Sequence, residues 1–378
     1  MNNTKPVTEY FLFLINASLR AILFFIIAKF FNSEDFIKFS YLVITLDLII
    51  SLANSSTLNF LIHHNKKFNI NIYVGELIIA LPISSIFFYF VSTDLEYILY
   101  LLLLLFIRLL ILLITRFYLT QNNIIQSLKY DFWGNSFWIF FVILLFIFNY
   151  KLSVINIFQI WITSSSIVLF LFFKLTNSKI RLNLSEINEF LKFFFKNFHF
   201  SYLYANFKTI ENFFILSFFY PQQLLVTYIL LNKMVNFSVD LSLNFIITKR
   251  WAGVQYMFIN ILSVALVLCL LFYFVYNIDY VQKTLNIFFE GKISYEYDNI
   301  LPFILLIALL YFLLRLIFIS LIKKKLFKII FISSLIIYLP FLIIILTDLS
   351  HNIFYFYILE SFALLFTIVF LKKYEDKI

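Results

Sequence analysis

The residues of this sequence best suited to chemistry are basic side chains deep inside apolar segments. They are Arg20, Arg108, Lys208, Lys233 and Arg315. A cation in the middle of a bilayer costs roughly 2.5–3.5 kcal/mol, so such residues normally face a protein interior or a watery cavity. Arginine binds phosphate through paired hydrogen bonds, and lysine acts as a point charge. The pattern therefore predicts a positively charged interior that binds an anionic head group.

Two carboxylates are predicted to lie at the depth of these cations. Asp47 and Glu211 each fall near the middle of an apolar run, and we regard both as candidates for ion coupling. Because the cations outnumber them, the interior should favour an anion such as a pyrophosphate. The alternative is structural pairing. Lys208 precedes Glu211 by one helical turn, and Arg20 is within reach of Asp47 on a neighbouring helix.

Other kinds of chemistry have little support in the sequence. The four histidines lack metal-ligand spacing, the single cysteine, Cys269, forms no disulfide framework, and no phosphate-binding glycine-rich loop is present. We therefore predict a protein that is not an enzyme and that has no cofactor or metal. Glu76 and Glu360 lack obvious neighbours and are candidates for a coupling proton, whereas Arg116 is expected to anchor the topology.

The composition places these residues in a membrane. Of 378 residues, 63% are hydrophobic and 13% are charged, whereas soluble domains average about 25% charged residues. A membrane span needs about 20 mostly apolar residues. We predict an all-α polytopic membrane protein with about 12 transmembrane helices. The predicted spans are 10–31, 37–60, 71–92, 97–119, 131–149, 153–174, 198–219, 224–247, 254–276, 299–321, 327–347 and 351–371.

The charges of the loops predict the orientation. Most Lys and Arg residues outside the spans fall in one set of loops, which comprises both termini and alternate connections. By the positive-inside rule this set is cytoplasmic, so both termini are predicted to lie in the cytoplasm. Most of the net charge of +9 is then explained by the Lys and Arg residues of the cytoplasmic loops, and no nucleic-acid partner is expected.

The sequence also predicts a division into two lobes. The N-terminal six-helix lobe is 1–175, a cytoplasmic linker is 176–197, and the C-terminal six-helix lobe is 198–378. In the linker, Ser185 is predicted to cap an amphipathic helix that lies on the membrane interface. That helix feeds into the seventh predicted span.

An internal repeat relates the two lobes. When the chain is slid along itself by half its length, Arg20 falls on Lys208, and RAILFFIIAKFF (20–31) lies over KTIENFFILSFF (208–219) without a gap. Since each half has six predicted spans, the halves should be parallel repeats about an axis along the membrane normal. Such symmetry places a substrate site between the lobes.

Two segments resemble a known family. The stretch IIAKFFNSEDFIKFSYLVITLDLIISLANSSTLNFLIHH (26–64) resembles the start of the lipid-linked polysaccharide flippases, the O-antigen translocases of the multidrug/oligosaccharidyl-lipid/polysaccharide exporter superfamily. TIENFFILSFFYPQQLLVTYILLNKM (209–234) resembles the corresponding part of their second half. The chain departs from the family pattern at Ile37 and Asn54, where Gly is usual, and at Glu211, where Asp is usual.

The resemblance implies a function. A flippase of this kind moves an undecaprenyl-pyrophosphate-linked repeat unit across the bacterial cytoplasmic membrane by alternating access. Its partners would be the lipid-linked oligosaccharide, the bilayer and the polysaccharide polymerase machinery. Two alternatives stay open. A drug/cation antiporter of the same superfamily would have a cavity dominated by carboxylates. A membrane-embedded polysaccharide polymerase would usually carry a long external loop, but the longest external connection, 277–298, is short.

Overall fold

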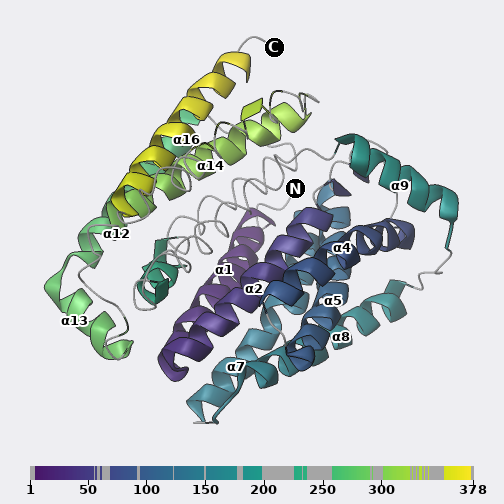
Figure 1. Cartoon of the computed structure of the whole chain (residues 1–378), viewed down its shortest axis with the longest axis horizontal. Coiled ribbons are helices and arrows are strands. Elements are labelled where there is room, and N and C mark those ends of the chain that lie inside the picture. Colours follow the sequence, from purple (N-terminus) through teal and green to yellow (C-terminus); the bar gives the residue numbers. More distant parts are fainter. Residues whose placement is uncertain are drawn as a thin grey trace. The chain divides into compact units, whose positions relative to one another are not determined.

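A computed structural model gives the architecture of much of the chain (Figure 1). It describes residues 5–54, 56–57, 60–61, 69–91, 94–121, 123–148, 150–176, 182–197, 225–231, 233–235, 258–289, 292, 301–323, 326, 329, 332–333, 336, 339 and 353–375. Every regular element in these ranges is a helix, and none is a strand. The all-α prediction is thus confirmed for the described ranges.

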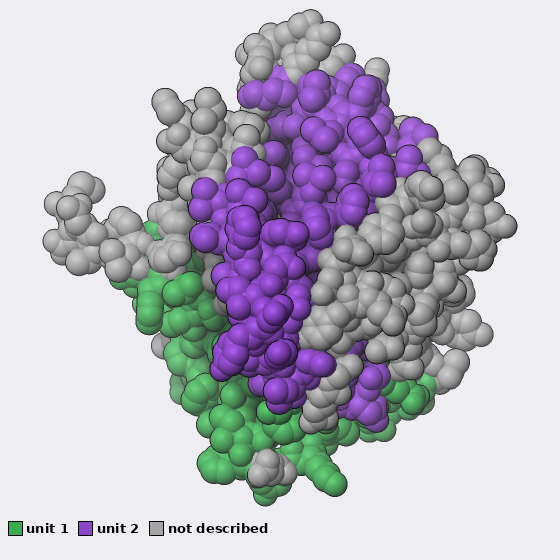
Figure 2. All heavy atoms as spheres, turned by 90° about the vertical axis from the view of Figure 1, so that its left-hand side faces the viewer, with its two compact units in different colours: residues 1–30, 34–198 green, residues 31–33, 199–378 purple. Residues whose placement is uncertain are grey.

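The chain divides into two compact units, which Figure 2 colours separately. Unit 1 comprises residues 1–30 and 34–198, and unit 2 comprises residues 31–33 and 199–378. The helices of unit 1 are α1 (Lys5–Phe30), α2 (Ser33–Ala53), α4 (Ile70–Val91), α5 (Leu95–Thr120), α6 (Ile124–Asp131), the π-helix η1 (Phe132–Ser136), α7 (Phe137–Ile147), α8 (Val154–Thr176) and α9 (Leu184–Asn197). Elements α6, η1 and α7 follow one another without a break.

Helix α5 is the centre of unit 1. It packs against α4, α6 and α8, and Leu101, Leu105 and Leu109 along it are fully buried. Its first turn is fixed by Asp94, whose side chain accepts a hydrogen bond from the backbone N–H of Glu96 at 3.1 Å. This apolar packing holds the polar side chains described below in place.

The described part of unit 2 includes three helices of 19 residues or more and one of ten residues. They are α12 (Phe258–Tyr276), α13 (Asp279–Phe288), α14 (Leu301–Lys323) and α16 (Ile353–Glu375). Helices α14 and α16 run side by side (Figure 1). Their contact includes the stacked rings of Phe303 and Tyr357, whose centroids are 6.4 Å apart.

Seven described helices are long and apolar enough to cross a membrane. They cover Phe11–Phe30, Ser33–Ala53, Ile70–Phe88, Leu95–Thr120, Ile124–Ile147, Val154–Lys174 and Leu301–Phe318. Six lie where the first six spans are predicted, and the seventh lies at the tenth predicted span. The described helices are therefore those expected of a multi-pass membrane protein.

Two predicted helix starts differ from the structure. The fifth span begins at Ile124 rather than at residue 131, because the side chain of Asn123 accepts a hydrogen bond from the backbone N–H of Gln126 at 3.3 Å and caps the helix there. Helix α9 begins at Leu184, and its start is held by Asn183, which accepts a hydrogen bond from the backbone N–H of Ser185 at 3.0 Å. Ser185 is therefore the capped residue and not the cap.

Candidate functional site

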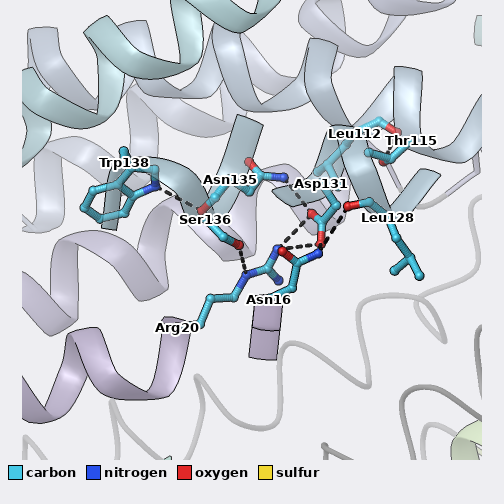
Figure 3. Close-up of polar contacts among 9 residues, drawn as sticks. All are labelled: Asn16, Arg20, Leu112, Thr115, Leu128, Asp131, Asn135, Ser136 and Trp138. Atoms are coloured by element: carbon cyan, nitrogen blue, oxygen red, sulfur yellow. Dashed lines mark hydrogen bonds and ion pairs between the residues drawn. The ribbon is translucent and has the colours of Figure 1, made fainter. Parts of the chain in front are cut away.

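The most complete polar cluster of unit 1 is built around Arg20 and Asp131 (Figure 3). Arg20 lies about halfway along the apolar stretch Phe11–Phe30 of α1. Its Nη2 atom donates to both carboxylate oxygens of Asp131, at 2.8 and 2.7 Å. Helix α1 packs against α6, η1 and α7, which brings these residues together although they are far apart in the sequence.

Three further side chains complete the cluster. Asn16, one turn before Arg20 on α1, donates to Asp131 Oδ2 at 3.3 Å. Asn135 of η1 donates to Asp131 Oδ1 at 2.9 Å. Ser136 Oγ accepts from Arg20 Nε at 3.3 Å. Donors from two helices therefore surround one carboxylate inside an apolar helix.

The π-helix η1 supplies part of this cluster. It directly follows Asp131 and includes Gly134, Asn135 and Ser136, which are all buried. Gly134 allows η1 to approach α5, because a Cβ atom at this position would lie 2.8 Å from two side-chain atoms of Ile111. Short π-helical segments inside α-helices occur frequently at functional sites. The η1 segment therefore marks the cluster as a candidate for function.

The guanidinium of Arg20 has room for another ligand. Its side chain is 46% exposed, whereas that of Asp131 is 25% exposed. Among the described residues, none accepts a hydrogen bond from Nη1 of Arg20. One edge of the guanidinium is thus available to an anionic group.

A second ion pair joins Arg108 of α5 to Asp47 of α2. Arg108 Nη1 donates to Asp47 Oδ1 at 2.5 Å. The guanidinium also lies 5.0 Å from the centroid of the Trp161 ring, a cation–π geometry. The side chain of Arg108 is 14% exposed and that of Asp47 is 50% exposed.

These pairs differ from the alternative in which Arg20 would pair with Asp47. Asp47 is occupied by Arg108, and Arg20 is held by Asp131. The side of α1 that carries Arg20 packs on α6 and η1. For this reason its carboxylate comes from the fifth predicted span and not from the second.

A third group of polar residues lies where α2 ends. Glu76 of α4 is fully buried and accepts a hydrogen bond from the hydroxyl of Thr57. Arg116 of α5 interacts electrostatically with Glu76, and its Nη1 donates to the carbonyl oxygen of Asn54 at 2.5 Å. Arg116, expected only to anchor the topology, is therefore part of an internal polar network.

The structure describes the remaining predicted site residues only in part. Lys233 lies in the short helical stretch 233–235 and is half-buried. Arg315 lies on α14, but its side chain is outside the described part. Lys208 and Glu211 also fall outside the described residues. Glu360 of α16 is fully buried and accepts a hydrogen bond from the hydroxyl of Tyr311 at 3.1 Å.

The interior arginines of unit 1 occur together with carboxylates, whereas the predicted excess of positive charge also counts Lys208, Lys233 and Arg315 of unit 2. Each of Arg20, Arg108 and Arg116 lies beside one carboxylate. The apolar run alone predicts a span whose cytoplasmic end is residue 131, so the sequence assigns Asp131 no role inside the membrane. The signal that could have found it is Asn123, followed three residues later by Gln126, a spacing typical of a helix start. Moving the helix start to this point places Asp131 inside the apolar helix.

Comparisons with known proteins identify no relative. A scan against protein-family models, a search of curated proteins and a search of solved structures each found no match.

Proposed function

We propose that the chain is a flippase that moves a lipid-linked oligosaccharide from the cytoplasmic to the outer leaflet of a bacterial cytoplasmic membrane. The substrate would be an undecaprenyl-pyrophosphate-linked repeat unit. The proposal includes twelve spans in two parallel six-helix repeats and cytoplasmic termini, as the loop charges predict. The proposal is supported by the length and apolar composition of the described helices, by the family resemblance of 26–64 and 209–234, and by the site at Arg20.

The observation that carries the proposal is the exposure of Arg20 halfway along an apolar helix. A charged side chain at that depth is not stable against lipid, so an exposed one normally faces water or a protein interior. Its side chain is 46% exposed, and its Nη1 edge is open to a ligand among the described residues. A polar substrate that passes along α1 would meet this edge.

The ion pair suggests how binding and release alternate. A pyrophosphate carries more negative charge than a single carboxylate, and arginine binds it through two parallel hydrogen bonds. The substrate would therefore compete with Asp131 for Arg20. When the substrate leaves, Asp131 takes the guanidinium back, and Asn16 and Asn135 keep its carboxylate in place. Arg20 is therefore never left without an anion, and the two amide hydrogen bonds offset part of the cost of leaving Asp131 without its arginine.

The charge balance of unit 1 favours a second candidate function. With Arg20, Arg108 and Arg116 each beside a carboxylate, the described interior is not strongly cationic. A drug/cation antiporter of the same superfamily would use such carboxylates to bind a cationic solute. The two functions predict opposite effects of removing Arg20, because its loss weakens anion binding and leaves Asp131 available to a cation.

Deletion of the gene in its own organism tests the proposed function. A flippase predicts that intact undecaprenyl-linked repeat units accumulate on the cytoplasmic side of the membrane. A polymerase predicts repeat units that reach the outer side but are not extended. Unchanged lipid-linked glycan together with increased sensitivity to cationic drugs would contradict the flippase and support the antiporter. Complementation with Arg20→Ala, compared with exposed Lys151→Ala as a matched control, then assigns the effect to the Arg20 site.

A further inference from the structure

Helix α13 of unit 2 follows the apolar helix α12 after a turn of only two residues, Asn277 and Ile278. The side-chain amide of Asn277 donates to the carbonyl oxygen of Tyr273 at 2.8 Å, in the last turn of α12. The carbonyl oxygen of Ile278 accepts a hydrogen bond from the backbone N–H of Gln282 at 3.1 Å, which starts α13. The chain changes direction at this turn (Figure 1). Helix α13 therefore begins at the depth at which α12 ends.

The length of α12 indicates what that depth is. Its 19 residues include no charged side chain, and they fall within the ninth predicted span, 254–276. A helix of this length is about 28 Å long, close to the roughly 30 Å of a bilayer core. Large apolar side chains of α12 are exposed as far as its last turn, among them Leu270, Leu271, Phe274 and Val275. The end of α12 and the start of α13 are therefore expected at the membrane surface.

Helix α13 directs two of its largest apolar side chains away from the protein. No side chain of this helix is fully buried. The side that includes Gln282, Leu285 and Asn286 is half-buried. Tyr280 and Ile287 lie on the other side of the helix, and each is 78% exposed. A helix at a protein surface in water normally turns its polar side chains outward, so the exposed side of α13 is suited to an apolar neighbour.

The exposed apolar side chains of α12 continue across the turn onto α13. Phe274 and Val275 in the last turn of α12 are exposed, Ile278 between the helices is exposed, and Tyr280 follows two residues later. Single exposed apolar side chains are common on proteins, whereas a contiguous group of them marks a surface that contacts another apolar body. For α12, as part of a predicted span, that body is lipid. The same lipid is the neighbour that the exposed side of α13 meets next.

We propose that α13 lies along the membrane surface, with Tyr280, Ile287 and Phe288 inserted between the lipids just below the head groups. Tyrosine suits this depth, because its ring is apolar while its hydroxyl reaches the water interface. The charged residues of α13 are Asp279 and Lys283, whose charges cancel, so burial of apolar surface holds the helix and attraction to anionic lipid does not. The proposal requires a multi-pass membrane protein and does not depend on the substrate that is transported.

The depth of α13 can be measured on the full-length protein in phosphatidylcholine vesicles. Cys269 is the single cysteine of the chain, and Cys269→Ala allows one environment-sensitive fluorescent label to be attached at a chosen position. The label is placed at Ile287→Cys, at Tyr280→Cys or, as a matched control, at Asp279→Cys, which is exposed on the polar side of the helix. Lipids with a nitroxide at a shallow or a deep position of the acyl chain report the depth of the label, and iodide reports its exposure to water.

We expect the labels at Ile287→Cys and Tyr280→Cys to lie about 5–10 Å below the head groups and to be protected from iodide. The label at Asp279→Cys should stay accessible to iodide. Replacing part of the phosphatidylcholine by phosphatidylglycerol should leave these depths unchanged, because the charges of α13 cancel. If one of the apolar variants does not fold, Phe288→Cys takes its place.

Three results would overturn the proposal. Strong quenching by iodide at Ile287→Cys and Tyr280→Cys would show that this side of α13 faces water. Energy transfer between copies labelled with a donor and an acceptor, without quenching by the nitroxide lipids, would assign the surface to a second copy of the chain. Insertion that occurs only with phosphatidylglycerol would show that charge, and not the apolar side chains, holds the helix at the membrane.

Discussion

Arg20 of α1 and Asp131 at the end of α6 form an ion pair in which Nη2 of Arg20 donates to both carboxylate oxygens of Asp131, at 2.8 and 2.7 Å. The pair sits inside apolar helices of unit 1, and the π-helix η1 follows it directly. Because the carboxylate also accepts hydrogen bonds from Asn16 and Asn135, it is fixed more firmly than the half-exposed guanidinium. The arginine is therefore the member of the pair that is free to exchange partners.

Removing each member of this pair should have opposite effects on anion binding. Asp131→Asn keeps the shape of the side chain but removes the competing negative charge, so the affinity for a pyrophosphate-bearing lipid should rise. Arg20→Ala should lower this affinity by about tenfold or more, which corresponds to about 1.4 kcal/mol. Titration of the purified variants with a fluorescent lipid pyrophosphate measures both. Equal affinities for wild type and Arg20→Ala would exclude Arg20 as the anion site.

The pair of Arg108 and Asp47 should contribute mainly to stability. Asp47→Ala leaves Arg108, which is 14% exposed, without its carboxylate. We expect the free energy of unfolding to fall by about 1–3 kcal/mol, between the values for exposed and buried pairs. Denaturation of the purified variants and of the wild-type protein measures this change in the free energy of unfolding. The double variant Arg108→Met with Asp47→Leu should recover most of the loss, and failure to recover would show that the charges themselves are needed.

Gly134 should tolerate no side chain while α5 is unchanged. A Cβ atom there would lie 2.8 Å from both Cδ1 and Cγ2 of Ile111. Gly134→Ala should therefore destabilise the fold by about 1–3 kcal/mol, the usual cost of overpacking. The Ile111→Ala change removes both atoms, so the double variant should be less unstable than the sum of the single changes. If thermal denaturation shows that the losses of stability of the two single variants simply add in the double variant, the contact between η1 and Ile111 does not cause the destabilisation by Gly134→Ala.

Gly75 should control how firmly α9 is held on α4. A methyl group at this position would overlap the ring of Phe190, so Gly75→Ala should push α9 away. Hydrogen exchange should then be faster at the backbone amides of residues 186–195, and the rest of unit 1 should exchange at its usual rate. Adding Phe190→Ala makes room for the methyl group and should slow the exchange again. Unchanged exchange in Gly75→Ala would mean that α9 is held by other contacts, such as the hydrogen bonds of Glu186.

The apolar runs were sufficient to predict where the described long helices of unit 1 lie. A run of about 20 hydrophobic residues has few alternatives to a spanning helix, because its backbone must satisfy its own hydrogen bonds in lipid. The amphipathic spacing of 184–195 likewise predicted α9, whose Ile187, Phe190 and Phe194 are buried. These features depend on local sequence, and for this reason they were predictable.

The pairing of charges was not predictable in the same way. Asp131 and Arg20 are separated by 111 residues, and their contact depends on which helices become neighbours. The sequence places Asp47 on the helix next to Arg20, and only the packing of α1 against α6 and η1 shows that Asp131 is closer. The network of Arg116, Asn54 and Glu76 arises in the same manner, from three helices that meet at one end.

Transport in reconstituted liposomes shows whether the chain moves a lipid-linked oligosaccharide and whether Arg20 takes part. Purified protein is inserted into vesicles whose inner leaflet carries a lipid-linked oligosaccharide, and the fraction that becomes accessible to an added glycosidase is followed over time. A flippase with an anion site at Arg20 predicts translocation above that of protein-free vesicles, a rate at least about tenfold lower for Arg20→Ala, and a normal rate for Lys151→Ala. A rate no faster than that of protein-free vesicles, or a normal rate in Arg20→Ala, would contradict it.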